Sequence, residues 1–598
     1  MAVTPQGISI QAAYRWFRDG RLIVNRQYQR KLVWTVPEKE RLIDSILKDY
    51  PLPLFLLAEK PSEAPDAAED ESIYEVIDGM QRLNAIFSYI ENGFLYDGRC
   101  FDVNEFARAR QLAEKGVFVT FPEDVARLDA KACANLQDYQ LAMTIFPGEI
   151  DARITDVFGR INSSGKQLSD QERRQAGVLS PYADLVRELS AEIRGDVSRE
   201  RLLLSEMPEI SIETTKNPHG YGLKAEEIFW CRQGVLRTNH LRDSDDEEIV
   251  ADICASLLYD EPVEASGDFK DRLYTEGSEE AKKVNLRLAA YGRDRLSQEV
   301  KKVFSLVREA IEASSDARFH FRDTVYPKAT SNPQKQAFYA TFMAIFDLVM
   351  REGQLPTSPE KIMPALENMS DRIMVGQKHI KAADRRQNIR VVKGLIADFF
   401  AKADVATLGH GPGLVFDFEN SLRRSRTETS RYEFKQGILR LHGDREVDDD
   451  LLTRLLETMC GIANCGPDGD GFLYLGIADS PKDAAQVKAL DAVESVPFEH
   501  VQIVGVEREA KAKGYTMDRY LRIIEDKIRQ SAISEPLKTQ LRTAMDVVTY
   551  KGMSVVRIRV PRQGDASFVG DDCFFRTGSS THNASGPQIA AISRLFAN

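Results

Sequence analysis

The chain has 598 residues, which is too long for a single hydrophobic core, so we expect roughly two to four domains. Its hydrophobic content of 43% and charged content of 29% are typical of a globular protein, and no apolar run approaches the ~20 residues needed to span a bilayer. The net charge of −12 excludes a protein coated in nucleic acid by bulk electrostatics, although it is compatible with a local basic groove.

The cysteine and histidine content bears on compartment and metal binding. The seven Cys residues are odd in number and form no CxxC pair, which indicates reduced thiols in a cytoplasm. The eight His residues are scattered, so we expect no structural zinc. The N-terminal residues lack a basic-then-apolar signal, and we therefore expect a cytoplasmic protein with no membrane partner. Two acidic runs, residues 62–71 and 243–248, have the composition of solvated loops.

Residues 1–180 mix strand and helix patterns. Helical spacing at residues 41–47 is followed by an extended, proline-bearing approach to a strand at residues 51–57. The next expected elements are a strand at 73–77, a helix at 83–90 that ends at Asn92-Gly93, and a strand at 139–146. We expect an α+β domain here.

The rest of the chain divides into a helical part and a second α+β part. Helical periodicity dominates residues 181–405, for example at 296–311, 336–350 and 389–400, and predicts a bundle that couples two functional ends and helps wall the N-terminal pocket. The breaker cluster at 408–413 marks the next boundary. Beyond it we expect strands at 431–434, 471–478, 554–560 and 573–576 and a helix at 448–463. The fold class is therefore multidomain α+β, with domains 1–180, 181–405 and 406–598.

The segment Asp78-Gly79-Met80-Gln81-Arg82 is the most informative short stretch. An apolar strand ends at Asp78, Gly79 allows a sharp turn, and Gln81 and Arg82 follow on the first turn of a helix. The backbone N–H groups and the dipole of a helix N-terminus favour an anion. An acid, an amide and a guanidinium at such a turn predict a site for a phosphorylated ligand.

Two other motifs lie in the same part of the chain. One is Tyr28-Gln29-Arg30 followed by Trp34, and the other contains Asn162-Ser163-Ser164-Gly165, with Ser169 and Glu172 as a predicted capping box. In this order the three motifs resemble the N-terminal domain of GmrSD-type modification-dependent restriction proteins, which belong to the ParB/sulfiredoxin-like superfamily.

The resemblance implies a nucleotide-binding or nucleotide-hydrolysing module that governs nuclease activity. It places Gln29, Arg30, Asp78, Gly79, Gln81 and Arg82 along the pocket, with Asn162 and Gly165 closing it. Arg30 and Arg82 are the best phosphate partners, because a guanidinium bonds two oxygens at once. Asp78 would hold a metal ion or orient one of these arginines. Met80 stands where the family has the first of two Gln residues, which favours binding over hydrolysis. The alternative is an Asp78–Arg82 pair that only holds the strand–helix junction.

A second cluster of chemically active residues comprises Glu428, Glu433, Lys435 and Asp479. Glu433 and Lys435 share a face of the predicted strand because side chains alternate with period two, and Asp479 ends the neighbouring strand. Three carboxylates that hold Mg²⁺ or Mn²⁺, beside a lysine that stabilises developing charge, suit phosphodiester hydrolysis. Glu-x-Lys on a strand is by itself also typical of a solvated face.

Further segments of the last 200 residues support a family resemblance for residues 420–598. Cys460-Gly461-Ile462-Ala463-Asn464, the run that ends at Asp479, and Phe574-Phe575-Arg576-Thr577-Gly578 resemble the Schlafen/AlbA-type domain, whose members bind nucleic acid and some of which cleave RNA. The resemblance implies metal and catalytic roles for Glu428, Glu433 and Asp479 beside Lys435. The turn at residues 464–471 is longer than in the family and puts cleavage in question. Candidate phosphate contacts, with ordinary surface charge as the alternative, are Arg423, Arg424, Arg426, Arg557, Arg559 and Arg576.

Together the two resemblances predict an anti-phage defence effector. A nucleoside triphosphate bound by the N-terminal domain would control a metal-dependent nuclease that acts on RNA or DNA. One alternative is a non-catalytic nucleic-acid-binding sensor that changes its oligomeric state with nucleotide, which would make the protein a homo-oligomer. The other alternative is an NTPase whose chemistry lies in the N-terminal domain.

Overall fold

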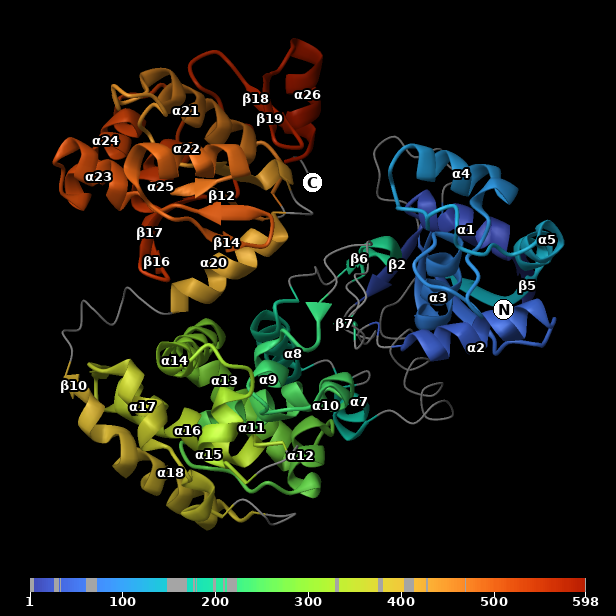
Figure 1. The fold of residues 1–598 in the computed structure, drawn as a ribbon, viewed down its shortest axis with the longest axis horizontal. Helices are drawn as coiled ribbons and strands as arrows, with labels where there is room; N and C mark the ends of the chain where they lie inside the picture. Colours follow the sequence, from blue (N-terminus) through green and yellow to red (C-terminus); the bar gives the residue numbers. More distant parts are fainter. Residues whose placement is uncertain are drawn as a thin grey trace. The chain divides into compact units, whose positions relative to one another are not determined.

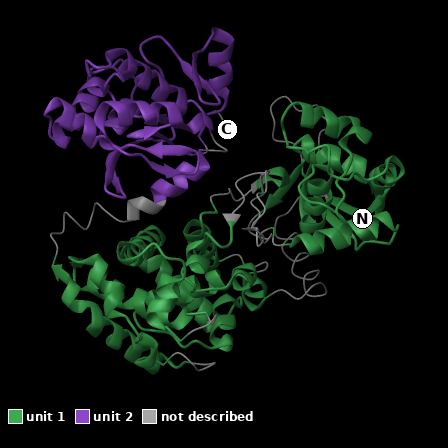
Figure 2. Ribbon diagram, in the orientation of Figure 1, with its two compact units in different colours: residues 1–405 green, residues 406–598 purple. Residues whose placement is uncertain are grey.

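The computed structural model describes most of the chain: residues 5–25, 32, 34–60, 72–147, 169–175, 178, 180–196, 201–207, 210–211, 223–328, 333–374, 380–402, 413–425, 429–467 and 469–596. The chain divides into two compact units, residues 1–405 and residues 406–598 (Figure 2). Each unit has a hydrophobic core of its own. None of the described helices is long and apolar enough to cross a membrane.

The first unit begins with an α+β domain (Figure 1). Its elements in chain order are β1 Gln6–Ser9, α1 Ile10–Arg18, β2 Leu22–Asn25, α2 Val36–Leu47, β3 Phe55–Lys60, β4 Ile73–Asp78, α3 Met80–Ile90, η1 Val103–Glu105, α4 Ala107–Glu114, α5 Ala130–Asp138 and β5 Gln140–Pro147. The strands and helices expected in residues 1–180 are confirmed, because each carries a strong apolar pattern whose side chains enter one core with those of α1 and α3.

The six-stranded mixed sheet of this domain has the order β1-β5-β3-β4-β2-β6. Strand β4 lies between β3, with which it runs antiparallel, and β2, with which it runs parallel. The edge strand β6, Arg201–Leu203, pairs antiparallel with β2, although it comes from the part of the chain expected to be helical. The N-terminal sheet is therefore completed by residues beyond position 180.

The helical region of the first unit has the expected character. Its elements are α7 Asp170–Gln175, α8 Pro181–Arg194, η2 Leu204–Glu206, α9 Phe229–Arg232, α10 Thr238–Arg242, α11 Asp245–Tyr259, α12 Gly267–Tyr274, α13 Glu279–Tyr291, α14 Arg293–Ser314, α15 His320–Val325, α16 Lys335–Phe346, η3 Asp347–Arg351, α17 Pro359–Ala365, η4 Met369–Asp371, α18 Ala382–Ile396 and η5 Ala397–Phe399. Two short strand pairs accompany them: β7 Ile210–Ser211 with β8 Leu223–Lys224, and β9 Gln354–Pro356 with β10 Phe400–Lys402. Trp230, Phe304 and Phe338 stack edge-on or tilted at the centre of this region.

The second unit is α+β. Its elements are α20 Gly413–Arg424, η6 Thr429–Arg431, β11 Tyr432–Lys435, α21 Asp449–Ala463, β12 Gly471–Leu475, β13 Ile477–Ala478, α22 Pro481–Asp491, β14 Val496–Phe498, β15 Val501–Ile503, α23 Glu507–Lys513, α24 Met517–Gln530, α25 Leu537–Thr543, β16 Met545–Tyr550, β17 Met553–Val560, β18 Phe574–Thr577, β19 Ser580–Asn583 and α26 Gly586–Arg594. Its main sheet has the order β11-β12-β17-β16, with β11 and β12 parallel.

The apolar run at residues 471–478 forms two strands, whereas we expected one. Gly476 has a φ of +101°, and its backbone N–H donates to the carbonyl of Lys435 at 2.9 Å. Beyond this glycine the chain leaves the main sheet, and β13 pairs with β15 in a separate three-stranded sheet. A left-handed glycine therefore redirects the chain just before Asp479.

Candidate functional site

The turn between β4 and α3 has the geometry that its sequence predicts. Gly79 is the N-cap of α3 with a φ of +102°, and a Cβ atom at this position would lie 2.4 Å from Cδ1 of Phe55. Among the described residues no side chain caps the N-terminus of α3, and the first turn of this helix holds no acidic residue. The backbone N–H groups of this turn therefore suit an anion.

Arg82 is held tightly by acceptors of the protein itself. Its guanidinium donates to the carbonyl of Pro53, to the carbonyl of Leu54 at 3.1 Å and to Oδ2 of Asp78 at 2.8 Å, and it lies 4.4 Å from the ring centroid of Phe55. Burial lowers the pKa of Arg82, and the Asp78 carboxylate opposes that shift. These contacts are those of the junction-holding alternative, so a phosphate would have to compete with two carbonyls for the guanidinium.

The remaining residues of this segment also face the protein. Met80, which stands where the resemblance implies a glutamine, is buried in the hydrophobic core. Oε1 of Gln81 accepts from the backbone N–H of Trp34 at 3.3 Å, which joins the second motif to the end of the first. Four predicted pocket residues, Gln29, Arg30, Asn162 and Gly165, lie outside the described residues.

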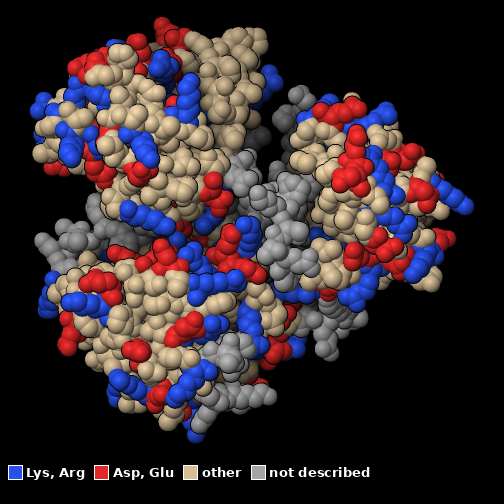
Figure 3. Space-filling model, viewed as in Figure 1, with Lys and Arg blue, Asp and Glu red and all other residues tan. Residues whose placement is uncertain are grey.

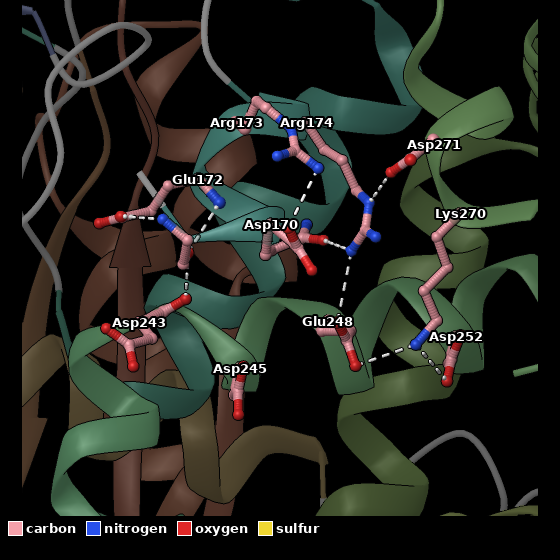
Figure 4. Close-up of polar contacts among 12 residues, drawn as sticks. Asp170, Glu172, Arg173, Arg174, Asp243, Asp245, Glu248, Asp252, Lys270 and Asp271 are labelled. Atoms are coloured by element: carbon pink, nitrogen blue, oxygen red, sulfur yellow. Dashed lines mark hydrogen bonds and ion pairs between the residues drawn. The ribbon is translucent and has the colours of Figure 1, made fainter. Parts of the chain in front are cut away.

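The end of the third motif is a helix cap, as predicted. The backbone N–H of Ser169 donates to Oε2 of Glu172 at 3.0 Å, and that of Glu172 donates to Oγ of Ser169 at 3.1 Å (Figure 4). The short helix α7 that follows is fixed by Arg174, whose guanidinium lies between Asp271 at 2.6 Å and Glu248 at 3.3 Å.

The acidic run at residues 243–248 is not the solvated loop that its composition predicts. Most of it opens helix α11, and Asp246 is completely buried. Glu248 receives Lys270 at 2.9 Å as well as Arg174, and Lys335 reaches Asp245 at 2.6 Å. The prediction was wrong because the cations that neutralise this run come from distant parts of the chain. The other acidic run, residues 62–71, lies outside the described residues.

In the second unit, Glu433 and Lys435 share a face of β11, as the strand alternation predicts. Nζ of Lys435 donates to Oε1 of Glu433 at 2.5 Å, while Arg576 lies 2.9 Å from Oε2. The Arg576 side chain is 0% exposed and also donates to the carbonyl of Tyr432 at 3.0 Å. Glu433 is therefore neutralised by two cations, and Arg576 positions it from inside the unit, away from the surface where we expected a phosphate contact.

The described residues do not form a metal site with this carboxylate. Asp479 is exposed and follows β13 in the second sheet, and Glu428 lies outside the described residues. Within the part of the chain that the structure describes, no group of three His, Cys, Asp or Glu residues is arranged to hold a metal ion. Both Glu433 oxygens already face cations, so this donor set does not fit Mg²⁺ or Mn²⁺ as it stands.

The strand register separates the candidate arginines from Glu433 and Lys435. Arg559 is paired with Phe472 and Arg557 with Tyr474, while Glu433 is paired with Leu473 on the same strand β12. Since neighbouring residues of a strand point to opposite faces, the two arginines lie on the face opposite to Glu433.

The arginines predicted to contact phosphate differ in how far their side chains are exposed. Arg559 is 53% exposed and lies 3.6 Å from Asp470, whereas Arg557 is nearly buried and bound to Asp546 at 2.8 Å. Arg423 donates to Asn420 at 3.0 Å, Arg424 is half-buried, and Arg426 lies outside the described residues. Lys and Arg side chains are interspersed with Asp and Glu over both units in the view of Figure 3, so this view presents no broad basic surface.

The first unit thus contains an α+β domain with a strand–glycine–helix turn suited to an anion. Residues 14–179 match the family described as GmrSD restriction endonuclease, N-terminal domain. For that part of the chain, the resemblance read from the three motifs is confirmed. The match does not reach residues 406–598, so the Schlafen-type resemblance there stays a prediction. A comparison with curated proteins gave no match.

Proposed function

We propose that this chain is a phage-defence protein of the restriction type that acts on nucleic acid. The observation that carries this proposal is the match of residues 14–179 to the GmrSD restriction endonuclease N-terminal domain. The proposal is tested by expressing the chain in a bacterial host and counting plaques of a panel of phages. A lower plaque count than in the host without the chain supports it, and unchanged counts across a broad panel overturn it.

We propose further that the N-terminal domain binds a nucleoside triphosphate at the β4–α3 turn. The support is local: within the described part of the chain Gly79 opens the helix without a side-chain cap, and Asp78 and Arg82 lie next to it. On binding, Arg82 would exchange its bonds to the Pro53 and Leu54 carbonyls for phosphate oxygens. Gln29, Arg30, Asn162 and Gly165 complete the pocket on the strength of their motifs. Hydrolysis of the bound nucleotide is not part of this proposal. It is expected only in the alternative in which the N-terminal domain is an NTPase.

The second unit is proposed as the part that binds RNA or DNA. In the cutting version of this proposal, Glu428, Glu433 and Asp479 would have to rearrange before they could hold Mg²⁺ or Mn²⁺, and Lys435 would stabilise developing charge. A second version, in which the unit binds without cutting, is favoured by the ion pairs of Glu433 with Lys435 and Arg576. One of these ion pairs would have to break before Glu433 could bind a metal ion.

The two versions are separated by one set of assays. Labelled RNA and DNA are incubated with the wild type, with Glu433→Gln and with Lys435→Ala, in Mg²⁺, Mn²⁺ or EDTA, each with and without ATP or GTP. Glu446→Gln is the matched control, because Glu446 is an exposed carboxylate paired with Lys513 in the same unit. If the wild type and Glu446→Gln cut nucleic acid while Glu433→Gln and Lys435→Ala do not, the nuclease version is supported. Binding that persists in Glu433→Gln with no cutting supports the sensor, and neither binding nor cutting overturns both.

A further inference from the structure

Arg242, at the end of α10, reaches from the helical region to the N-terminal domain. Its guanidinium donates to both carboxylate oxygens of Glu38, at 2.8 Å and 2.6 Å. Glu38 lies in the first turn of α2, where a negative charge is also favoured by the helix dipole. Both bonds come from the same terminal nitrogen of Arg242, and hydrogen bonds between two charged groups are stronger than those between neutral groups.

Glu38 in turn belongs to the segment that adjoins the β4–α3 turn. Its Oε2 accepts from the backbone N–H of Thr35 at 2.9 Å and from the Thr35 hydroxyl at 3.0 Å. The preceding residue, Trp34, donates its backbone N–H to Gln81 on the first turn of α3. Arg242 is therefore connected to the second motif by hydrogen bonds and by the peptide bond between Trp34 and Thr35.

The next residue, Asp243, contacts the third motif. Its carbonyl accepts from the hydroxyl of Ser169 at 2.6 Å, and Ser169 is the residue that caps α7 (Figure 4). Two consecutive residues, Arg242 and Asp243, thus contact Glu38 and Ser169. These two partners flank different motifs and lie 131 positions apart in the chain.

The Arg242–Asp243 turn is itself fixed in place. Ser244, which follows it, is buried in a left-handed conformation with a φ of 61° at the N-cap position of α11. One residue further on, Asp245 is bound by Lys335 of α16 at 2.6 Å. The turn is therefore part of the packed helical region, and a shift of the motif flanks would have to move the start of α11.

We infer that the Arg242–Asp243 turn is a clamp that positions the flanks of the proposed nucleotide site and transmits its occupancy to helix α11. This inference rests on the proposed nucleotide-binding function. Arg242 is a positioning residue, because it acts on the site through Glu38 and the Trp34–Gln81 contact. The clamp lets a nucleotide at the β4–α3 turn and the helical region stabilise each other, since coupling between two sites is reciprocal.

The first test measures the Kd of fluorescent N-methylanthraniloyl ATP and GTP for the full chain. Arg242→Ala and Glu38→Gln each weaken binding by about tenfold, and the double variant is no weaker than the worse single one. Glu38→Gln is informative because a glutamine preserves the capping box with Thr35 while it removes the charge pair. The control Arg293→Ala removes an exposed pair with Glu188 in the helical region and leaves the Kd within about twofold.

The second test is hydrogen exchange of α10, α11 and α7 with and without the same nucleotides. In the wild type, nucleotide protects the α10–α11 junction; in Arg242→Ala that protection is lost, and Arg242→Lys restores part of it. If circular dichroism shows that Arg242→Ala does not fold, Arg242→Lys and Glu38→Gln are compared with the wild type instead. Equal affinity and equal protection in the wild type and these variants overturn the clamp alone. No nucleotide binding by the wild type overturns both the clamp and the proposed nucleotide function.

Discussion

Position 79 requires glycine for two separate reasons. The φ of +102° disfavours any residue with a Cβ atom, and the ring of Phe55 occupies the space where that atom would lie. Many glycines of this chain satisfy only the first reason. Gly116, for example, has a φ of +73°, but no atom of the described residues lies within 4 Å of an added Cβ. The two positions therefore separate backbone strain from steric overlap.

Gly79→Ala should lower the free energy of unfolding by about 1–3 kcal/mol more than Gly116→Ala does, because only the former drives a methyl group into Phe55. Urea denaturation of both variants and the wild type measures the difference. Equal losses at the two positions would mean that the Phe55 contact carries no cost.

Arg82 has a structural role that is independent of any ligand. Arg82→Lys keeps the charge but loses the planar fork that serves two carbonyls and Asp78, so the free energy of unfolding should fall by about 1–2 kcal/mol. Arg99→Lys, at an exposed pair with Asp97, should change it by less than about 0.5 kcal/mol. If Arg82 also binds phosphate, the folded variant loses about tenfold in nucleotide affinity. An unchanged Kd with lowered stability would leave Arg82 as a junction residue only.

Short-range patterns of single residues were predictable, and their distant partners were not. The pairing of Glu433 with Lys435 follows from strand alternation, and the Ser169–Glu172 cap follows from helix geometry. Nothing local indicates that Arg576 reaches the other oxygen of Glu433, or that Arg242 reaches Glu38, because both contacts depend on the tertiary fold. The buried acids of α11 were missed for the same reason.

At the scale of elements, strong apolar patterns located part of the helices and strands of both α+β regions, among them α2, α3 and β4 in the first and α21 and β17 in the second. Among the elements that were not predicted, or were predicted with other bounds, two are informative. Strand β6 has three residues and is stabilised by its pairing with β2 more than by its own sequence. The run at 471–478 reads as one strand because apolar content does not reveal the left-handed φ of Gly476.

The register of β11, β12 and β17 leads to a prediction about nucleic acid. If RNA or DNA lies on the face that carries Phe472 and Arg559, then Arg559→Ala should weaken binding and reduce the slope of log K against log salt by about 1. Arg529→Ala, an exposed arginine of α24 paired with Asp526, should leave the slope unchanged. A loss in Lys435→Ala but not in Arg559→Ala would place the nucleic acid on the opposite face.

At the scale of the whole molecule, the two compact units have separate cores and are expected to unfold separately. Calorimetry of the full chain should resolve two transitions, and ATP or GTP at 100 times its Kd should stabilise only that of residues 1–405, by about 2.7 kcal/mol. Leu83→Ala and Leu473→Ala each remove a fully buried side chain from one of the two cores. Each variant should lower the free energy of unfolding of its own unit by about 2–5 kcal/mol, which assigns the two transitions. If nucleotide stabilised only the transition that Leu473→Ala assigns to residues 406–598, the proposed site would be contradicted.

Strand β6 follows helix α8 in the chain, yet it supplies the last strand of the N-terminal sheet. A gene fusion that joined only residues 1–180 to another effector would leave β2 as an unpaired edge, open to pairing with other chains. Recombination that preserves the sheet has to break the gene beyond Leu203. We therefore expect the N-terminal domain and the first part of the helical region to be inherited together, while residues 406–598 are exchanged as a module.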